Sequence, residues 1–213
     1  MKKQSQFIPA LRFQWLTPLY DPILRWVMHE DQFKKELIRQ AEISPGQKVL
    51  DLGCGTATLT IMVKEAHPGT EVVGLDADPN VLSLGRLKAL KAGVSVTLDH
   101  GMSYALPYAE NAFDRVLSSL MFHHLTSQKK QQTLKEVYRV LKRDGWLWIA
   151  DFGSPVGMWA RMISPLMARL EEVGDHHKGL IPVMMQDAGF RDAVTRCRFT
   201  TVFGTLNLYG GRK

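Results

Sequence analysis

Short apolar runs rich in β-branched residues alternate with amphipathic stretches from about residue 45 onward. The runs at 48–52, 71–75, 94–98, 115–119 and 146–150 have the length and composition of buried β-strands. The stretches between most of them carry apolar residues at helical spacing. This alternation predicts an α/β fold in which helices cover both faces of a mostly parallel sheet.

Local signals indicate where several of these elements begin and end. Asp78 followed by Pro79 predicts a helix start, with Asp78 as the N-cap, and Gly93 predicts the end of that helix. Ser127 is expected to cap the next helix. After a short helix near 182–188, the β-like runs at 193–200 and 202–209 nearly touch in sequence, which predicts an antiparallel pair.

Two segments depart from the alternation. Residues 1–44 indicate one or two helices, an N-terminal helical cap or lid ahead of a binding domain at 45–213. Within that domain, residues 152–180 are rich in Met and are expected to form a helical cover. Their apolar stripe either packs on the domain, lines an apolar acceptor pocket or rests on a membrane surface. Its members are Trp159, Met162, Ile163, Leu166, Met167 and Leu170.

Composition is that of a globular protein, with 45% apolar and 23% charged residues among 213. No apolar run is long enough to span a bilayer, and the basic start lacks a secretory signal. The net charge of +6 is divided between the two ends, while residues 49–151 are neutral, which favours a solvated basic surface over a nucleic-acid footprint. Cys54 and Cys197 offer neither a disulfide framework nor a metal quartet, as expected in a reducing cytoplasm.

The strongest chemical signal is VLDLGCGT at 49–56, which ends a strand and opens a helix. Gly53 and Gly55 permit a tight turn and a close approach of backbone to ligand. Asp76 follows the second strand, and ligands of open α/β sheets bind at the carboxyl ends of the strands. Asp51 and Asp76 are therefore both expected to face a nucleoside-binding crevice.

The kind of nucleoside follows from what the motif lacks. Thr58 stands where a dinucleotide fingerprint has its third glycine, and the chain contains no P-loop. Asp51 would repel a pyrophosphate but suits a cationic ligand. These features favour S-adenosylmethionine, which carries a sulfonium and an ammonium group.

Over residues 45–213 the sequence resembles the class I S-adenosylmethionine-dependent methyltransferases, particularly those of ubiquinone and menaquinone biosynthesis. The matching motifs are VLDLGCGT at 49–56, VVGLDAD at 72–78, ALPYAENAFDRVLSS at 105–119, FHHL at 122–125 and VYRVLKRDGWLWIADF at 137–152. The resemblance implies a Rossmann-like, seven-stranded and mostly parallel sheet whose last strand is antiparallel.

The resemblance also implies cofactor contacts. The loop of Gly53, Cys54, Gly55 and Thr56 would hold the methionine moiety, Asp76 the ribose hydroxyls, and Ala77 and Ser119 would lie beside the cofactor. Relatives commonly have Asp or Asn followed by Ala where this chain has Met102-Ser103. Met102 cannot hydrogen-bond the adenine amino group but can pack on the ring. Asp99 lies three residues earlier, out of register.

Three residues are candidates for catalysis. His123 and His124 offer a general base near the crevice, or else form a polar, helix-capping pair. Tyr20, with Asp21, resembles a pair that relatives place in a lid, or else marks a turn before Pro22. His176 and His177 are adjacent and would diverge, so we expect no metal site.

The sequence thus predicts methyl transfer from S-adenosylmethionine to a small, largely apolar or aromatic acceptor, with S-adenosylhomocysteine as product. An RNA methyltransferase and a non-catalytic module that binds cofactor or partner are the alternatives. We expect a cytoplasmic monomer or homodimer without specific nucleic-acid binding or a transmembrane segment, and with peripheral membrane contact at most.

Overall fold

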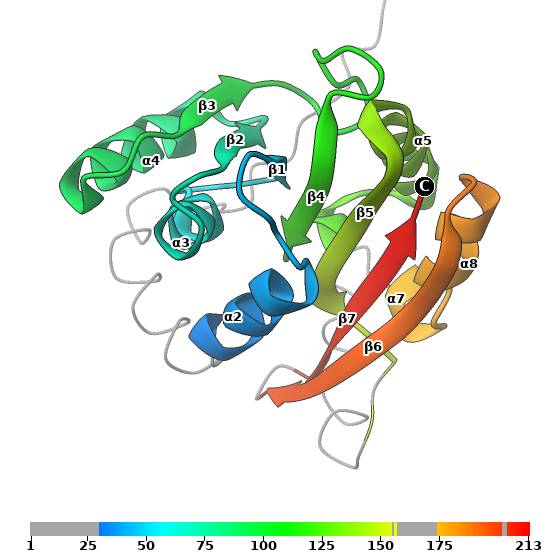
Figure 1. Cartoon of the computed structure of the whole chain (residues 1–213). Coiled ribbons are helices and arrows are strands. Elements are labelled where there is room, and N and C mark those ends of the chain that lie inside the picture. The colour runs from blue at the N-terminus through cyan, green and yellow to red at the C-terminus, as the bar shows by residue number, and fades with distance from the viewer. Residues whose placement is uncertain (1–29, 155, 157–173, 202–203) are drawn as a thin grey trace, which may run out of the picture.

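The computed structural model describes residues 30–154, 156, 174–201 and 204–213. In these ranges seven strands form one sheet in the order β3-β2-β1-β4-β5-β7-β6 (Figure 1). They are β1 (Lys48–Leu52), β2 (Glu71–Asp76), β3 (Thr97–His100), β4 (Phe113–Ser119), β5 (Leu141–Phe152), β6 (Arg191–Thr201) and β7 (Gly204–Arg212). Strands β1 to β5 pair in parallel, and β7 is antiparallel to both its neighbours. The expected Rossmann-like fold is confirmed.

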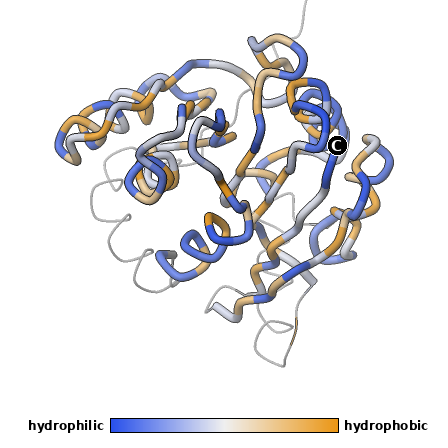
Figure 2. Tube along the Cα trace, in the orientation of Figure 1, coloured by the Kyte–Doolittle hydropathy of each residue, from blue (hydrophilic) through white to orange (hydrophobic). Residues whose placement is uncertain are grey.

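Helices cover both faces of the sheet, as the alternating pattern predicts. The described helices are α2 (Glu30–Gln40), α3 (Thr58–Ala66), α4 (Pro79–Ala92), η2 (Phe122–His124), α5 (Ser127–Val140), α7 (Gly174–His177) and α8 (Ile181–Asp187). Along β1, Leu50 packs in one core with α5 and α8, whereas Val49 packs on the opposite face with α2 and α3. Successive strand residues point to opposite faces, so one short apolar run contributes to both cores. Along the helices, hydrophilic positions are interspersed with hydrophobic ones (Figure 2).

Several boundaries differ from the sequence-based expectation. The run at 94–98 does not form a strand from its start, because Val94 N–H donates to Ala89 O at the end of α4 and β3 begins only at Thr97. Strand β5 begins at Leu141, five residues earlier than expected, because Leu141 pairs with Phe113 across a register shift. The final pair is also longer than expected.

Helix caps decide where α4 and α5 begin. Asp78 accepts a hydrogen bond from Asn80 N–H at 2.8 Å, and Gly93 ends α4 with a positive φ of 67°, so both expectations hold. For α5 the expected cap at Ser127 is wrong. Thr126 is the N-cap, and its hydroxyl accepts from Lys129 N–H. Ser127 is the first helical residue, and its hydroxyl donates to Asp175.

The two covering segments are described only in part. Within 1–44, helix α2 packs Phe33 and Leu37 into the core, and residues 1–29, including Tyr20, lie outside the described ranges. The apolar stripe from Trp159 to Leu170 also lies outside them. The division into an N-terminal cap, a binding domain and a cover at 152–180 remains a prediction.

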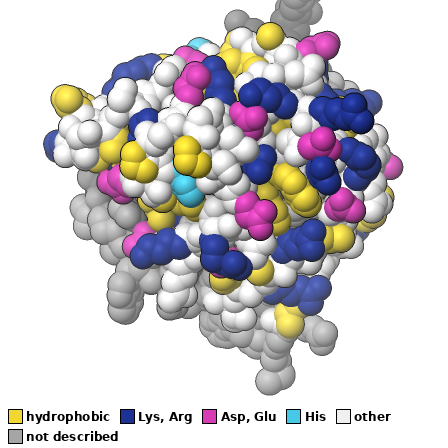
Figure 3. Space-filling model, viewed as in Figure 1, with side chains coloured by type: hydrophobic (Ala, Val, Ile, Leu, Met, Phe, Trp, Pro, Cys, Tyr) yellow, Lys and Arg dark blue, Asp and Glu magenta, His cyan; other side chains and the backbone are white. Residues whose placement is uncertain are grey.

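The described helices and surface bear on the expectations of no transmembrane segment and no nucleic-acid footprint. None of the described helices has the length and apolar character needed to cross a membrane. On the face shown in Figure 3, Lys and Arg side chains are interspersed with Asp and Glu rather than forming one basic track.

Candidate functional site

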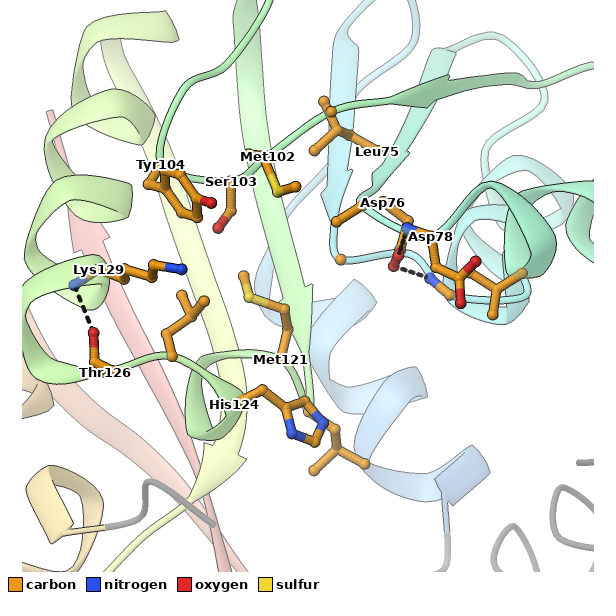
Figure 4. Close-up of a pocket in the computed structure, with 17 residues that line it drawn as sticks. Leu75, Asp76, Asp78, Met102, Ser103, Tyr104, Met121, His124, Thr126 and Lys129 are labelled. Atoms are coloured by element: carbon orange, nitrogen blue, oxygen red, sulfur yellow. Dashed lines mark hydrogen bonds between the residues drawn. The ribbon is translucent and has the colours of Figure 1, made fainter. Parts of the chain in front are cut away.

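A cavity of about 310 Å³ lies at the carboxyl ends of the parallel strands. Four segments form its walls: the turn after β1, the end of β2 with the start of α4, the loop after β3, and the segment from the end of β4 into α5. Its lining residues are Gly53, Gly55, Leu75, Asp76, Ala77, Asp78, Val81, Gly101, Met102, Ser103, Tyr104, Leu120, Met121, His124, Leu125, Thr126 and Lys129. Figure 4 shows the acidic side chains on one side and Tyr104 with Lys129 on the other.

The two glycines of the turn after β1 have different roles. Both have positive φ, 74° at Gly53 and 52° at Gly55, a conformation that favours glycine. A Cβ at Gly53 would lie 2.3 Å from Cγ of Met121, so this glycine makes room for a pocket side chain. A Cβ at Gly55 would meet no atom within 4 Å. Gly55 is therefore the residue whose bare backbone is left open to a ligand.

Asp76 organises the pocket at the end of β2. Its Oδ2 accepts a hydrogen bond from Gly55 N–H at 2.8 Å, and its Oδ1 accepts from Asp78 N–H at 3.0 Å. Each carboxylate oxygen has a further lone pair, because a carboxylate can accept about four hydrogen bonds. The arrangement fixes the carboxylate and leaves acceptor capacity for a pair of hydroxyl groups.

Six of the ten candidate cofactor residues line this pocket: Gly53, Gly55, Asp76, Ala77, Met102 and Ser103. The other four, Asp51, Cys54, Thr56 and Ser119, lie behind its wall. The expectation that Asp51 faces the crevice is wrong, because its side chain is buried and Oδ2 accepts from the Thr60 hydroxyl at 2.6 Å. Burial raises the pKa of Asp51 to about 6, and the nearby charge of Asp76 adds to this effect.

Cys54, Thr56 and Ser119 are not among the lining residues and contact other parts of the protein. Cys54 packs in a buried cluster with Leu82 and Leu98, and burial together with the Asp51 and Asp76 carboxylates raises the pKa of its thiol. The Thr56 hydroxyl lies 3.4 Å from Nζ of Lys88. The Ser119 hydroxyl is buried and makes no hydrogen bond in the described part of the chain.

The loop after β3 contributes Gly101, Met102, Ser103 and Tyr104 to the pocket lining, none of which carries a carboxylate or an amide side chain. The Ser103 hydroxyl lies 3.0 Å from the Thr133 hydroxyl, with which it shares a hydrogen bond. Asp99 accepts from the Tyr108 hydroxyl at 3.0 Å and is not among the residues that line the pocket. Met102 lines the pocket with its thioether. On the far side, Nζ of Lys129 lies 4.7 Å from the centre of the Tyr104 ring.

The two candidate histidines differ in position. His124 is exposed and lines the pocket, and its ring centre lies 4.0 Å from that of His123. His123 is buried, with Nδ1 2.8 Å from Oδ1 of Asp151 in β5. Asp151 also accepts from the backbone N–H of His123 at 3.3 Å and from that of Phe152 at 2.7 Å. Burial acts to raise the pKa of Asp151, but attraction to His123 and His176 and these hydrogen bonds outweigh it and hold the pKa below its usual range.

His176 lies close to this pair. Its Nδ1 is 2.9 Å from Phe152 O, while its Nε2 is buried without a hydrogen bond among the described residues. Burial lowers the pKa of His176, and the charge of Asp151 opposes that effect. In the described ranges, no group of three or more His, Cys, Asp or Glu residues is arranged to hold a metal ion.

Sequence reasoning missed Asp151, Tyr104, Met121 and Lys129. Asp151 had a visible signal, because a single acid follows five mostly apolar residues in the strand run 146–150. Tyr104, Met121 and Lys129 had none, since their position depends on how three loops meet in space.

Comparisons with known proteins agree with this geometry. Residues 49–145 match the family model described as "Methyltransferase domain". The chain is 30% identical to a demethylmenaquinone methyltransferase of Listeria welshimeri over 204 residues, which cover 84% of this chain and 85% of that protein. It is 34% identical to the Listeria monocytogenes protein of the same name over 67% of this chain and 61% of that protein. The solved structure of Haemonchus contortus phosphoethanolamine N-methyltransferase 2 in complex with S-adenosyl-L-methionine has a similar fold, with a TM-score of 0.70, 16% identity, and coverage of 85% of this chain and 52% of that one.

Proposed function

Because this chain belongs to the class I S-adenosylmethionine-dependent methyltransferases, we propose that its acceptor is a small, largely apolar or aromatic molecule and that His123 takes a proton from it. The single observation that carries this proposal is the buried His123–Asp151 pair, 2.8 Å apart at the carboxyl end of the sheet. The names of the Listeria relatives indicate a quinone ring as the kind of acceptor.

The residues of the pocket fit S-adenosylmethionine. Asp76 has a fixed carboxylate suited to the ribose hydroxyls, and the open space at Gly55 admits the methionine moiety beside bare backbone. The two lining carboxylates, Asp76 and Asp78, suit a ligand that carries positive charge. When bound, the cofactor supplies an electrophilic methyl group on a sulfonium centre.

Asp151 gives His123 the geometry of a base. An ionised Asp151 accepts the Nδ1 proton of His123, which leaves Nε2 with its lone pair. The Phe152 ring meets the His123 ring edge to face at 4.9 Å and limits its rotation. His123 thus resembles the base of a His–Asp pair, in which the carboxylate fixes the tautomer and stabilises the protonated ring. A hydroxyl or an acidic carbon of the acceptor would lose its proton to Nε2 as the methyl group is transferred.

Catalysis also requires that the acceptor be held in the correct position. Methyl transfer is an in-line displacement, so holding the acceptor against the methyl group and excluding water supply much of the rate. Leu120, Met121 and Leu125, which lie close to His124 in the chain, give the pocket an apolar wall. Such a wall suits a flat, apolar acceptor better than a phosphodiester chain.

The test is methyl transfer from labelled S-adenosylmethionine to three kinds of acceptor: a reduced naphthoquinone with a free ring carbon, total RNA and total protein. We expect label in the quinone. His123→Asn and Asp151→Asn should lower kcat by at least about 100-fold, the scale of general-base catalysis, while S-adenosylhomocysteine affinity stays within about twofold.

The matched control is His67→Asn, in the turn after α3 and outside the lining residues. It should leave kcat unchanged. Asn is chosen at 123 because its amide can still donate to Asp151 and so protects the fold. Label chiefly in RNA would overturn the proposed acceptor, and full activity of His123→Asn would overturn the proposed base. Tight S-adenosylhomocysteine binding with no turnover on any acceptor would favour a non-catalytic module.

A further inference from the structure

We propose that the adenine end of the cofactor is recognised by a hydrogen-bond donor, the ammonium group of Lys129, in place of the carboxylate or amide acceptor that relatives use. Lys129 would donate to N7 of the ring, and the protein would make no hydrogen bond to the 6-amino group. The proposal rests on S-adenosylmethionine occupying this pocket and deepens the assignment of that site.

The pocket itself determines which end receives the base. Asp76 and Gly55 lie together at the ends of β2 and β1, and they fix the ribose and the methionine side. The cavity continues from Asp76 to the loop after β3 and the start of α5, where Met102, Tyr104 and Lys129 line it. A planar base attached to a ribose at Asp76 therefore extends toward these three side chains.

The side-chain acceptors near this end already have hydrogen-bond partners within the protein. The Ser103 hydroxyl shares its hydrogen bond with Thr133 at 3.0 Å, and Asp99 accepts from Tyr108 at 3.0 Å. Asp78 caps α4 through Asn80 N–H at 2.8 Å, and Figure 4 shows its carboxylate turned toward that helix. Met102 offers a thioether, which is a weak acceptor. An exocyclic amino group would have to share an acceptor with one of these existing partners.

A donor is present at the same place. Lys129 is the one Lys or Arg among the described lining residues. The Thr126 hydroxyl accepts from its backbone N–H in the first turn of α5, and its ammonium lies 4.7 Å from the Tyr104 ring centre. The face of an aromatic ring attracts a cation and so holds the ammonium at the edge of the cavity. Its three N–H groups match the ring nitrogens of adenine, which only accept.

The consequence is an unusual specificity. An acceptor in the protein discriminates strongly against a 6-oxo ring, because two acceptors then face one another. A lysine does not, since both N7 and a 6-oxo group accept from it. The site should therefore bind the hypoxanthine analogue of the product about as well as the adenine form.

Calorimetric titration with S-adenosylhomocysteine and S-inosylhomocysteine tests this directly. The wild-type protein should bind the two within about threefold, and Lys129→Met should weaken both by about 10-fold, the scale of one charged hydrogen bond. Lys135→Met, an exposed lysine of the same helix, is the matched control and should change neither. Thermal unfolding of Lys129→Met should match wild type without ligand.

Three results would overturn the proposal. If S-inosylhomocysteine binds wild type at least about 30-fold more weakly than S-adenosylhomocysteine does, a protein acceptor must hydrogen-bond the 6-amino group. Unchanged affinity in Lys129→Met would show that the lysine does not contact the cofactor. If Lys129→Met weakens S-adenosylmethionine but not its decarboxylated form, the lysine reads the cofactor carboxylate instead. All three are binding measurements, so they are independent of the proposed acceptor and base.

Discussion

The backbone N–H of Gly55 donates to the carboxylate of Asp76 at 2.8 Å, and this bond joins the turn after β1 to the end of β2. The same carboxylate accepts from Asp78 N–H at the start of α4. Two walls of the pocket are thus held at a fixed separation by one side chain that also faces the ligand.

Removing the Asp76 side chain should weaken cofactor binding more than it lowers the stability of the fold. We expect Asp76→Ala to cost about 1.5–3 kcal/mol in S-adenosylhomocysteine binding, the scale of charge-assisted hydrogen bonds. Titration calorimetry measures the loss, and urea unfolding checks the fold. Asp78→Asn is the comparison, because Asn is an equally good N-cap and should preserve α4, and losing this carboxylate should weaken the affinity much less than Asp76→Ala does. A comparable loss in Asp78→Asn would mean that overall negative charge matters and not Asp76 itself.

Two glycine variants distinguish the stability cost of backbone strain from the loss of cofactor affinity caused by filling the pocket. Gly55→Ala and Gly46→Ala both place alanine at positive φ, 52° and 80°, with no atom within 4 Å of the new Cβ. Each should lose about 1 kcal/mol of stability for that conformation. Only Gly55→Ala should also lose cofactor affinity, because only Gly55 lines the pocket. Equal affinities in the two variants would show that the ligand does not approach this turn.

Asp51 should make stability depend on pH in an unusual direction. Burial raises the pKa of Asp51 to about 6 in the folded protein, above the unfolded value near 3.8. Its stabilising contribution is therefore complete below about pH 4 and is lost as the pH rises through 6. Asp51→Asn lacks this loss, so its stability relative to wild type should improve by about 2 kcal/mol between pH 4 and pH 7. Urea unfolding of both proteins across that range measures the difference, and a constant difference would contradict it.

The ion pair between Lys130 and Asp175 ties α5 to α7. Lys130 is fully buried, and its Nζ lies 3.1 Å from Oδ2 of Asp175. Lys130→Ala should cost about 2–4 kcal/mol, because it leaves a mostly buried carboxylate without its cation. Lys142→Ala breaks the more exposed pair with Asp114 and should cost less than about 1 kcal/mol. Urea unfolding distinguishes the two, and similar costs would show that burial does not govern this pair.

The architecture was predictable from the sequence because its signals are local. The strand run at 48–52, the cap at Asp78 and the stop at Gly93 depend on a few adjacent residues, and all appear where expected. The start of β3 was misplaced because Val94 and Val96 are apolar without being paired. They pack against a buried cluster from a turn, and periodicity does not distinguish that from a strand.

The site was predictable only as far as its backbone motif. Gly53, Gly55 and Asp76 follow from spacing along one strand–turn–helix unit. Asp51 belongs to the same motif, yet its carboxylate turns inward to Thr60, since alternation along β1 does not specify how the following turn closes. The His123–Asp151 pair joins η2, which follows β4, to the neighbouring strand β5, and its two residues are 28 positions apart in sequence, so only the fold brings them together.

The sheet order also bears on how the chain folds during synthesis. In the described structure, β6 pairs only with β7, so it has no place in the sheet until the residues from 204 onward have been made. Every described residue that lines the pocket lies between 53 and 129 and has already left the ribosome by then. Cofactor bound to the half-finished sheet would stabilise it by mass action. Until β7 arrives, the edge of β5 that pairs with β7 in the finished sheet is open to wrong pairing.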